Sequence, residues 1–222
     1  MVHMLLESFD IAAPWLYDSL KPYFHPAQKV AIVAFSFRDS RVKGAADWDA
    51  LYHPEQGRYY GGITGGFLAY GIREENIRWI NYFTDSKEKA ARIISEADIV
   101  YFPGGLPDRM MERIDEFGLR DVLMQHEGIV MGYSAGAVIQ MAQYHLSPDE
   151  DYPDFAYYEG LPWLRGFYLE VHYEGTPDQN RAIQRVLREK GQTVYATALG
   201  RGALLIDHGQ MRLLGDVKVF TP

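Results

Sequence analysis

The stretch that decides the fold is IVMGYSAGA, residues 129–137, in which an apolar, β-branched run leads directly into a Gly-x-Ser-x-Gly turn. Helix-compatible residues follow, so the stretch predicts a strand, a tight turn and a helix. Gly132 and Gly136 leave room for the turn and for close packing of the helix. Such a turn exposes the Ser134 hydroxyl at the end of the sheet, beside the backbone N–H groups of a helix N-terminus. Ser134 is therefore a candidate nucleophile.

Strand and helix patterns alternate before this stretch. Buried strands are predicted where apolar, β-branched runs are bounded by polar residues, at 29–37, 77–83 and 99–102. Helices are predicted at 59–71, at 87–97 after an Asp85-Ser86 N-cap, and at 108–126 with a break at Gly118. The polar segment 39–57 is expected to be a loop.

After Ser134 the chain becomes acidic and aromatic, and 146–162 is expected to be a loop. A strand is predicted at 167–171, and a helix at 176–190 with Pro177 in its first turn. Terminal strands are predicted at 193–198, 203–206 and 210–214, the last two joined by a hairpin turn at 207–209.

This alternation predicts parallel βαβ units in an open, doubly wound sheet, within a single domain spanning residues 1–222. Such sheets bind ligands at the C-terminal ends of their strands. Both the Gly104-Gly105 turn, which follows the predicted strand 99–102, and the Ser134 turn fall at that edge.

The amino-acid composition argues against several classes of binding partner and of catalytic chemistry. The formal net charge is −8 and no lysine- or arginine-rich run is present, which argues against nucleic acid or a membrane surface as the main partner. There is no cysteine, so disulfides, thiol catalysis and thiolate metal sites are excluded. No apolar stretch approaches a membrane span and the first ten residues do not resemble a signal peptide, so we expect a cytoplasmic protein.

A serine nucleophile needs a base, and His172 is the best placed of the seven histidines. It ends a predicted strand and precedes a glycine turn and a helix, at the ligand-bearing edge of the sheet. The other histidines suit surface or core roles: His3, His25, His53, His126, His145 and His208.

The residue that orients the base stays open among several acids. The loop after the serine helix carries Asp149, Glu150 and Asp151, and Glu170 lies two residues before His172. For the oxyanion hole, the natural donors are the N–H of Ala135 and the N–H of Gly105 or Leu106.

These motifs resemble peptidase family S51, which includes dipeptidase E (an aspartyl dipeptidase) and cyanophycinase. The resemblance rests on the Ser-Ala-Gly-Ala turn at Ser134, on Gly104-Gly105 one unit earlier and on His172, and it extends from about Ile99 to the C-terminus. It implies a three-layer α/β/α sandwich of the flavodoxin-like, class I glutamine amidotransferase-like type, in which a serine replaces the usual cysteine.

The implied activity is hydrolysis of small peptides, after an N-terminal aspartate in dipeptidase E. Ser134 then corresponds to the nucleophile and His172 to the base. The family's aspartate in the loop after the serine helix corresponds to Asp149, or to Asp151 if the gap is placed differently.

Three positions depart from the family pattern. Leu106 follows the Gly-Gly turn, where the family usually has Asn or Asp to hold substrate. No acid lies near 200–202, where cyanophycinase carries its triad glutamate. The arginine that binds the substrate's aspartate has Arg181 as its nearest candidate, and Glu170 is a further candidate for lining the substrate site.

Two other functions remain open on the sequence. The amidotransferase-like fold also supports non-catalytic ligand-binding or regulatory proteins. An α/β-hydrolase esterase would need a late histidine, for which only His208 is available, and no His-Gly-Gly-Gly oxyanion segment is present. No cofactor or metal is expected. The oligomeric state stays open, with a homodimer as one option.

Overall fold

The computed structural model describes all 222 residues. Its strands are β1 Val2–Leu6, β2 Val30–Val33, β3 Ile77–Ile80, β4 Ile99–Phe102, β5 Ile129–Tyr133, β6 Gln143–Leu146, β7 Ala156–Glu159, β8 Phe167–Tyr173, β9 Thr193–Asp207 and β10 Gln210–Phe220. Its α-helices are α1 Pro14–Leu20, α2 Ala45–Tyr52, α3 Tyr60–Ala69, α4 Lys87–Ser95, α5 Pro107–Glu116, α6 Arg120–Met124, α7 Ala135–Val138 and α8 Pro177–Lys190.

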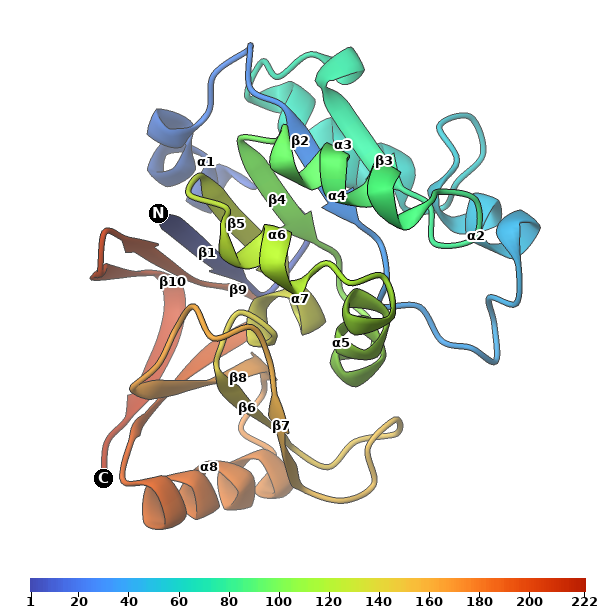
Figure 1. The fold of residues 1–222 in the computed structure, drawn as a ribbon. Helices are drawn as coiled ribbons and strands as arrows, with labels where there is room; N and C mark the ends of the chain where they lie inside the picture. Colours follow the sequence, from blue (N-terminus) through green and yellow to red (C-terminus); the bar gives the residue numbers. More distant parts are fainter.

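Eight of the strands form one mainly parallel sheet in the order β10-β9-β1-β5-β4-β2-β3, with β8 paired to β9 (Figure 1). Strands β1 to β5 run parallel to one another, whereas β9 runs antiparallel to β1 and to β10. The structure therefore has the α/β class and the mainly parallel, doubly wound sheet that the sequence predicts.

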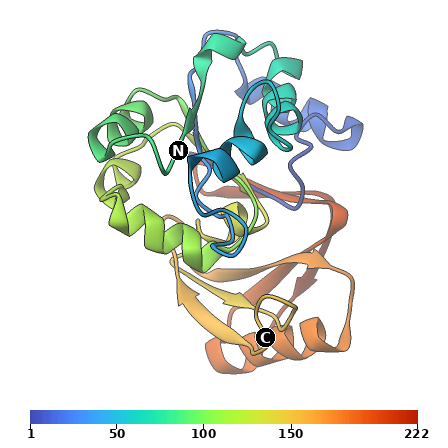
Figure 2. The ribbon, with the colours of Figure 1, turned by 90° about the vertical axis from the view of Figure 1, so that its right-hand side faces the viewer.

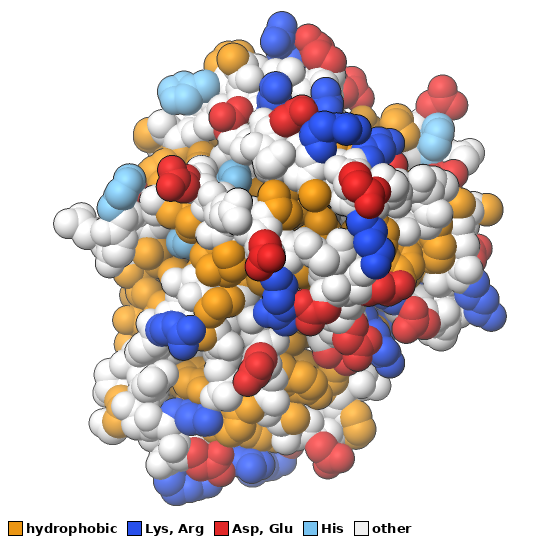
Figure 3. All heavy atoms as spheres, viewed as in Figure 1, with side chains coloured by type: hydrophobic (Ala, Val, Ile, Leu, Met, Phe, Trp, Pro, Cys, Tyr) orange, Lys and Arg blue, Asp and Glu red, His pale blue; other side chains and the backbone are white.

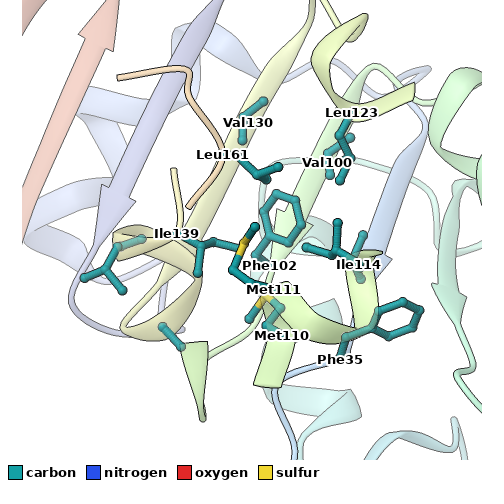
Figure 4. Packing of buried hydrophobic residues seen from close by; sticks show 14 of the residues in the cluster. Phe35, Val100, Phe102, Met110, Met111, Ile114, Leu123, Val130, Ile139 and Leu161 are labelled. Atoms are coloured by element: carbon teal, nitrogen blue, oxygen red, sulfur yellow. The ribbon is translucent and has the colours of Figure 1, made fainter. Parts of the chain in front are cut away.

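Helices cover both faces of this sheet. On one face, α4, α5, α6 and α7 bury residues such as Ile94, Met110 and Leu123 against Val100, Phe102 and Val130 of the strands (Figure 4). On the other face, α1, α2 and α3 pack against the opposite sides of the same strands. The alternating sides of a strand face opposite layers, which is why one apolar strand supplies both cores.

The chain after residue 140 extends the sheet beyond this three-layer body (Figure 2). Helix α8 packs on β8 and on the first half of β9 around a small core that includes Tyr168, Ile183 and Val194. Thr176 caps α8 in a capping box with Gln179, and Gly191 ends it in the left-handed conformation. The hairpin β6-β7 forms a separate two-stranded sheet.

Strand β9 brings together two strand ends that are distant in sequence. Its first part pairs in parallel with β8, and its second part pairs antiparallel with β1. Strand β8 ends at Tyr173 opposite Ala198, and β1 ends at Leu6 opposite Ala203. The C-terminal ends of β1 and β8 therefore meet near the middle of β9.

Several predicted boundaries are wrong. The segments expected to be loops contain α2 and β7, the N-terminal strand β1 and helix α1 were not predicted, and the two strands expected between 193 and 206 form one continuous β9. Helix α7, after Ser134, has only four residues, so His145 lies on β6 rather than at the end of that helix. Pairing with β8 up to Ala198 and with β1 from Ala203 keeps both halves in one strand, although Gly200 between them has φ +76°. The break that the sequence indicates is a local irregularity within β9.

On the face shown in Figure 3, acidic and basic side chains are interspersed rather than gathered by sign. No helix is long and apolar enough to cross a membrane.

Candidate active site

Ser134 occupies a strained turn between β5 and α7. Its backbone has φ 53° and ψ −116°, a sparsely populated conformation for a residue other than glycine that costs about 1–3 kcal/mol. The Ser134 N–H donates to Leu6 O at 3.0 Å, which ties the turn to the end of β1. A Cβ on Gly132 would lie 2.5 Å from Gly136 O, so the glycine is required for this close packing.

His172 lies at a bulge near the end of β8 and faces Ser134. Its Nε2 atom is 2.8 Å from Ser134 Oγ. The register of β8 on β9 shifts between Glu170 and Tyr173, and His172 has φ 53°, so the bulge turns its ring toward Ser134. Gln179 of α8 donates to His172 O at 2.8 Å and holds this backbone in place. The side chain is 42% exposed, which leaves it open to a substrate.

Glu7, immediately after β1, is the acid that contacts His172. Its Oε1 lies 2.5 Å from His172 Nδ1, and its Oε2 accepts the Gly200 N–H at 2.6 Å. The side chain is only 4% exposed, so both oxygens are held in fixed directions away from water. Glu7 reaches His172 because β1 and β8 both end at the middle of β9.

Asp149 does not take the place that the sequence analysis expected for it. Its Oδ1 accepts the N–H groups of Asp151 and Tyr152, each at 2.8 Å, and so forms a turn within its own loop. Asp151 pairs with Arg38 instead of with His172. The carboxylate that contacts His172 is that of Glu7, which follows an N-terminal strand that the sequence pattern did not indicate.

Glu170 lies close to the site but makes contacts of its own. It is buried on β8, accepts the Ser147 hydroxyl at 2.8 Å and lies 2.7 Å from His145 Nε2. This buried cluster forms one wall of a pocket that reaches Ser134 and His172. Glu170 therefore lines a pocket beside Ser134 and is not the partner of His172.

Two backbone N–H groups are available to an oxyanion at Ser134. Gly105 has φ +141° and is exposed, and its N–H has no backbone or side-chain acceptor. Ala135 begins α7, where N–H groups lack partners within the helix. The Leu106 N–H, the alternative donor, is already bonded to Ser36 O at 2.8 Å, and the Leu106 side chain lines neither pocket at Ser134.

Two pockets meet at Ser134, Gly105, His172 and Arg38. The first, here called the arginine pocket, has a volume of about 390 Å³, and besides these four its walls include Arg41, Arg58, Tyr52, Tyr59 and Tyr133. The second, here called the acidic pocket, has a volume of about 470 Å³, and its walls include His145, Asp149, Asp151, Glu170 and Glu174. Burial raises the pKa of Tyr133 to about 12, so its phenol stays neutral.

The remaining expected residues lie elsewhere. Arg181 is 70% exposed on α8, pairs with Asp178 and lines neither pocket. His208 is 79% exposed in the β9-β10 turn, where it contacts Asp207, so it is not the base of an esterase site. No group of three or more His, Asp or Glu side chains is arranged to hold a metal ion.

Comparisons with known proteins identify the family and the fold. The family model for peptidase family S51 matches residues 63–214. A crystal structure of a candidate peptidase E protein from Listeria monocytogenes EGD-e is similar, with a TM-score of 0.66, 15% identity and coverage of 97% of this chain and 98% of that one. A peptidase from an acI-B1 Actinobacterium has a TM-score of 0.66 and 16% identity, covering 99% and 89% of the two chains.

No curated protein matches the chain significantly by sequence. The two solved structures, at such low identity, show the shared fold alone. The family match is different, because it spans more than half of the chain and includes Ser134, His172 and the Gly104-Gly105 turn. The chain belongs to peptidase family S51.

Proposed function

We propose that the protein is a serine peptidase that hydrolyses small peptides through an acyl-enzyme on Ser134, with His172 as general base and Glu7 as the group that orients it. The observation that carries the proposal is the continuous hydrogen-bonded chain from Ser134 Oγ through His172 to Glu7. This is the arrangement that activates a serine in unrelated serine hydrolases.

The proposed reaction follows from the hydrogen-bonded atoms of Ser134, His172 and Glu7. His172 Nε2 takes the Ser134 proton as Oγ bonds to the carbonyl carbon of the peptide, and the carbonyl oxygen gains the charge. The N–H groups of Gly105 and Ala135 stabilise that oxyanion. When the intermediate collapses, the C–N bond breaks and His172 gives the proton to the leaving amine. Water then attacks the acyl-enzyme, again with His172 as base, and releases the acid.

Glu7 has a defined role in these reaction steps. Its Oε1 accepts a hydrogen bond from Nδ1–H, which leaves the Nε2 lone pair directed at Ser134. When His172 becomes an imidazolium, the buried carboxylate stabilises the new charge.

The test is hydrolysis of a panel of dipeptides, tripeptides and aminoacyl amides by the wild type and by Ser134→Ala and His172→Ala. Each substitution is expected to reduce kcat by a factor of about 10⁴ or more, because the members of a triad act as a unit. Far-ultraviolet circular dichroism checks that the variants are folded. Wild-type protein that cleaves nothing and does not react with a fluorophosphonate at Ser134 would favour a non-catalytic ligand-binding role instead.

For substrate preference we propose acidic peptides, with Asp-Xaa dipeptides as the first to test. The support is the arginine pocket, in which Arg41 and Arg58 have no carboxylate within ion-pair distance. The only acid lining that pocket, Asp47, accepts the Lys43 N–H. Two guanidinium groups without a carboxylate partner, in a pocket that Ser134 also lines, favour a substrate with a carboxylate there.

The prediction is that Arg41→Gln and Arg58→Gln each raise KM for Asp-Xaa about 10- to 100-fold, with a smaller effect on Ala-Xaa. A charge-assisted hydrogen bond to a carboxylate contributes about 1.5–3 kcal/mol, and each 1.4 kcal/mol is a factor of about ten. Arg181→Gln is the matched control and should leave both substrates unchanged, since Arg181 pairs with Asp178 outside the site. An Arg181 effect larger than those of Arg41 and Arg58 would contradict the assignment.

A further inference from the structure

The turn that carries the Gly105 N–H is held by one buried hydroxyl group. Ser36 lies just after β2, is fully buried and touches the Gly104-Gly105 turn of the neighbouring strand β4. Its Oγ donates to Gly104 O at 2.6 Å, and its backbone oxygen accepts the Leu106 N–H at 2.8 Å. The Ser36 residue therefore binds the chain on both sides of Gly105.

We propose that Ser36 is a positioning residue for the oxyanion hole, acting through the orientation of the Gly104–Gly105 peptide. The inference rests on the proposed function. In a trans peptide the C=O and the N–H point in opposite directions. A hydroxyl that fixes Gly104 O consequently fixes the direction of the Gly105 N–H, which is the one without a protein partner.

The hydroxyl is needed because glycine by itself does not hold this orientation. A peptide bond between two glycines rotates between alternative orientations at little steric cost. The rotated form would turn the Gly104 carbonyl oxygen toward the site in place of the N–H. An oxygen at that place repels the oxyanion rather than stabilising it. Ser36 opposes that rotation, since Gly104 O would lose its buried donor.

A second layer of contacts holds Ser36 itself. Arg113 of α5 donates to Phe35 O at 2.5 Å and to Phe37 O at 2.8 Å, the carbonyl groups on either side of Ser36. The guanidinium group is buried, lies 3.7 Å from the Phe37 ring centroid and pairs with Asp39. Helix α5 begins at Pro107, directly after the glycine turn, so the turn and its support are fixed to the same helix.

The experiment compares Ser36→Ala with the wild type in steady-state kinetics and in inhibitor binding. We expect kcat to fall about 10- to 100-fold with KM within about 2-fold, because only the transition state carries the oxyanion. A peptide aldehyde, which forms a tetrahedral adduct on Ser134, should lose affinity by a similar factor. A non-hydrolysable reduced peptide, which has no carbonyl oxygen at that position, should bind unchanged.

Ser36→Thr keeps the hydroxyl and should recover most of kcat, whereas Ser95→Ala is the matched control. Ser95 donates to Arg92 O at the end of α4, away from both pockets, so its loss should change none of these quantities. If Ser36→Ala does not fold, Ser36→Cys, which keeps the shape but donates weakly, replaces it with the same expected result.

The inference would be overturned by a kcat within about 2-fold of the wild type, or by equal weakening of the aldehyde and the reduced peptide. The second result would mean a general distortion of the site. Absence of any Ser134-dependent turnover in the wild type would instead refute the proposed function, and the inference with it. The two failures are therefore distinguishable by the wild-type assay.

Discussion

At the scale of single residues, the proposed role of Glu7 depends on the hydrogen-bond partners that surround its buried carboxylate. A carboxylate that is 4% exposed is costly to bury unless it is paired, and Glu7 has two charge-assisted hydrogen bonds, to His172 and to the Gly200 N–H. Both partners come from the C-terminal part of the chain, more than 160 residues away. Through these two hydrogen bonds, Glu7 connects the end of β1 to His172 on β8 and to Gly200 in the middle of β9.

We predict that Glu7→Gln lowers kcat about 10²- to 10⁴-fold. The amide has nearly the same shape, but it can present N–H to His172 and stabilise the wrong tautomer, and it does not stabilise the imidazolium. Asp149→Asn serves as the comparison and should cost much less, because Asp149 only bonds backbone N–H groups of its own loop. Steady-state kinetics of both variants test this prediction. A larger fall in kcat for Asp149→Asn than for Glu7→Gln would mean that Asp149 orients His172.

At the scale of elements, the loop between β6 and β7 forms part of the wall of the acidic pocket. It is attached at two points: Asp151 pairs with Arg38 after β2, and the Tyr152 hydroxyl donates to Asp108 Oδ1 at 2.5 Å at the start of α5. Burial and the Asp108 carboxylate raise the pKa of Tyr152, so the phenol remains a donor. Arg38 lines both pockets, so this attachment limits the space on either side of Ser134.

We predict that Arg38→Asp, which places two like charges opposite each other, opens this loop and raises kcat/KM for tetrapeptides relative to dipeptides about 10-fold. The double variant Arg38→Asp with Asp151→Arg restores the ion pair and should restore the original ratio. Arg181→Asp controls for the change in net charge. An unchanged ratio in Arg38→Asp would show that the loop does not limit peptide length.

At the scale of the whole molecule, two histidines are buried in the sandwich without a charged partner. Burial lowers the pKa of His3, which lies 3.0 Å from Gln140 Oε1, and of His126, whose Nε2 lies 3.2 Å from Ile129 O, below the ordinary value of 6.5. Both are neutral in the folded protein at neutral pH, whereas in the unfolded chain they take up protons near pH 6.5.

The unfolded state therefore binds more protons than the folded state below pH 6.5. The free energy of unfolding should be highest above that pH and fall as the pH decreases toward the lowered pKa values of the folded state. Each histidine contributes a slope of at most about 1.4 kcal/mol per pH unit. Urea unfolding between pH 8 and 5 measures it, and His3→Gln should reduce the slope. A slope unaffected by this change would mean that other groups control acid unfolding.

The residues predicted for the centre of the site, Ser134 and His172, lie in contact in the structure, and the sequence signals that point to them are local. A strand, a Gly-x-Ser-x-Gly turn and a helix are contiguous in sequence, so Ser134 and its strained turn can be predicted without knowing what packs around them. The same holds for the Gly104-Gly105 turn and for His172 at the end of a strand. Each of these depends only on where a parallel strand ends.

The sequence alone therefore determined the α/β class, the turn at Ser134 and the strand end at His172, because each of these depends on residues that are neighbours in the sequence. Only the tertiary structure showed that Glu7 contacts His172, that Arg41 and Arg58 line the pocket at Ser134, and that Ser36 holds the Gly104-Gly105 turn. Glu7 meets His172 because β9 pairs with both β1 and β8, and Ser36 meets Gly104 because β2 pairs with β4. These contacts depend on the strand order in the sheet, and the pattern of residues along the sequence does not specify which distant strands become neighbours.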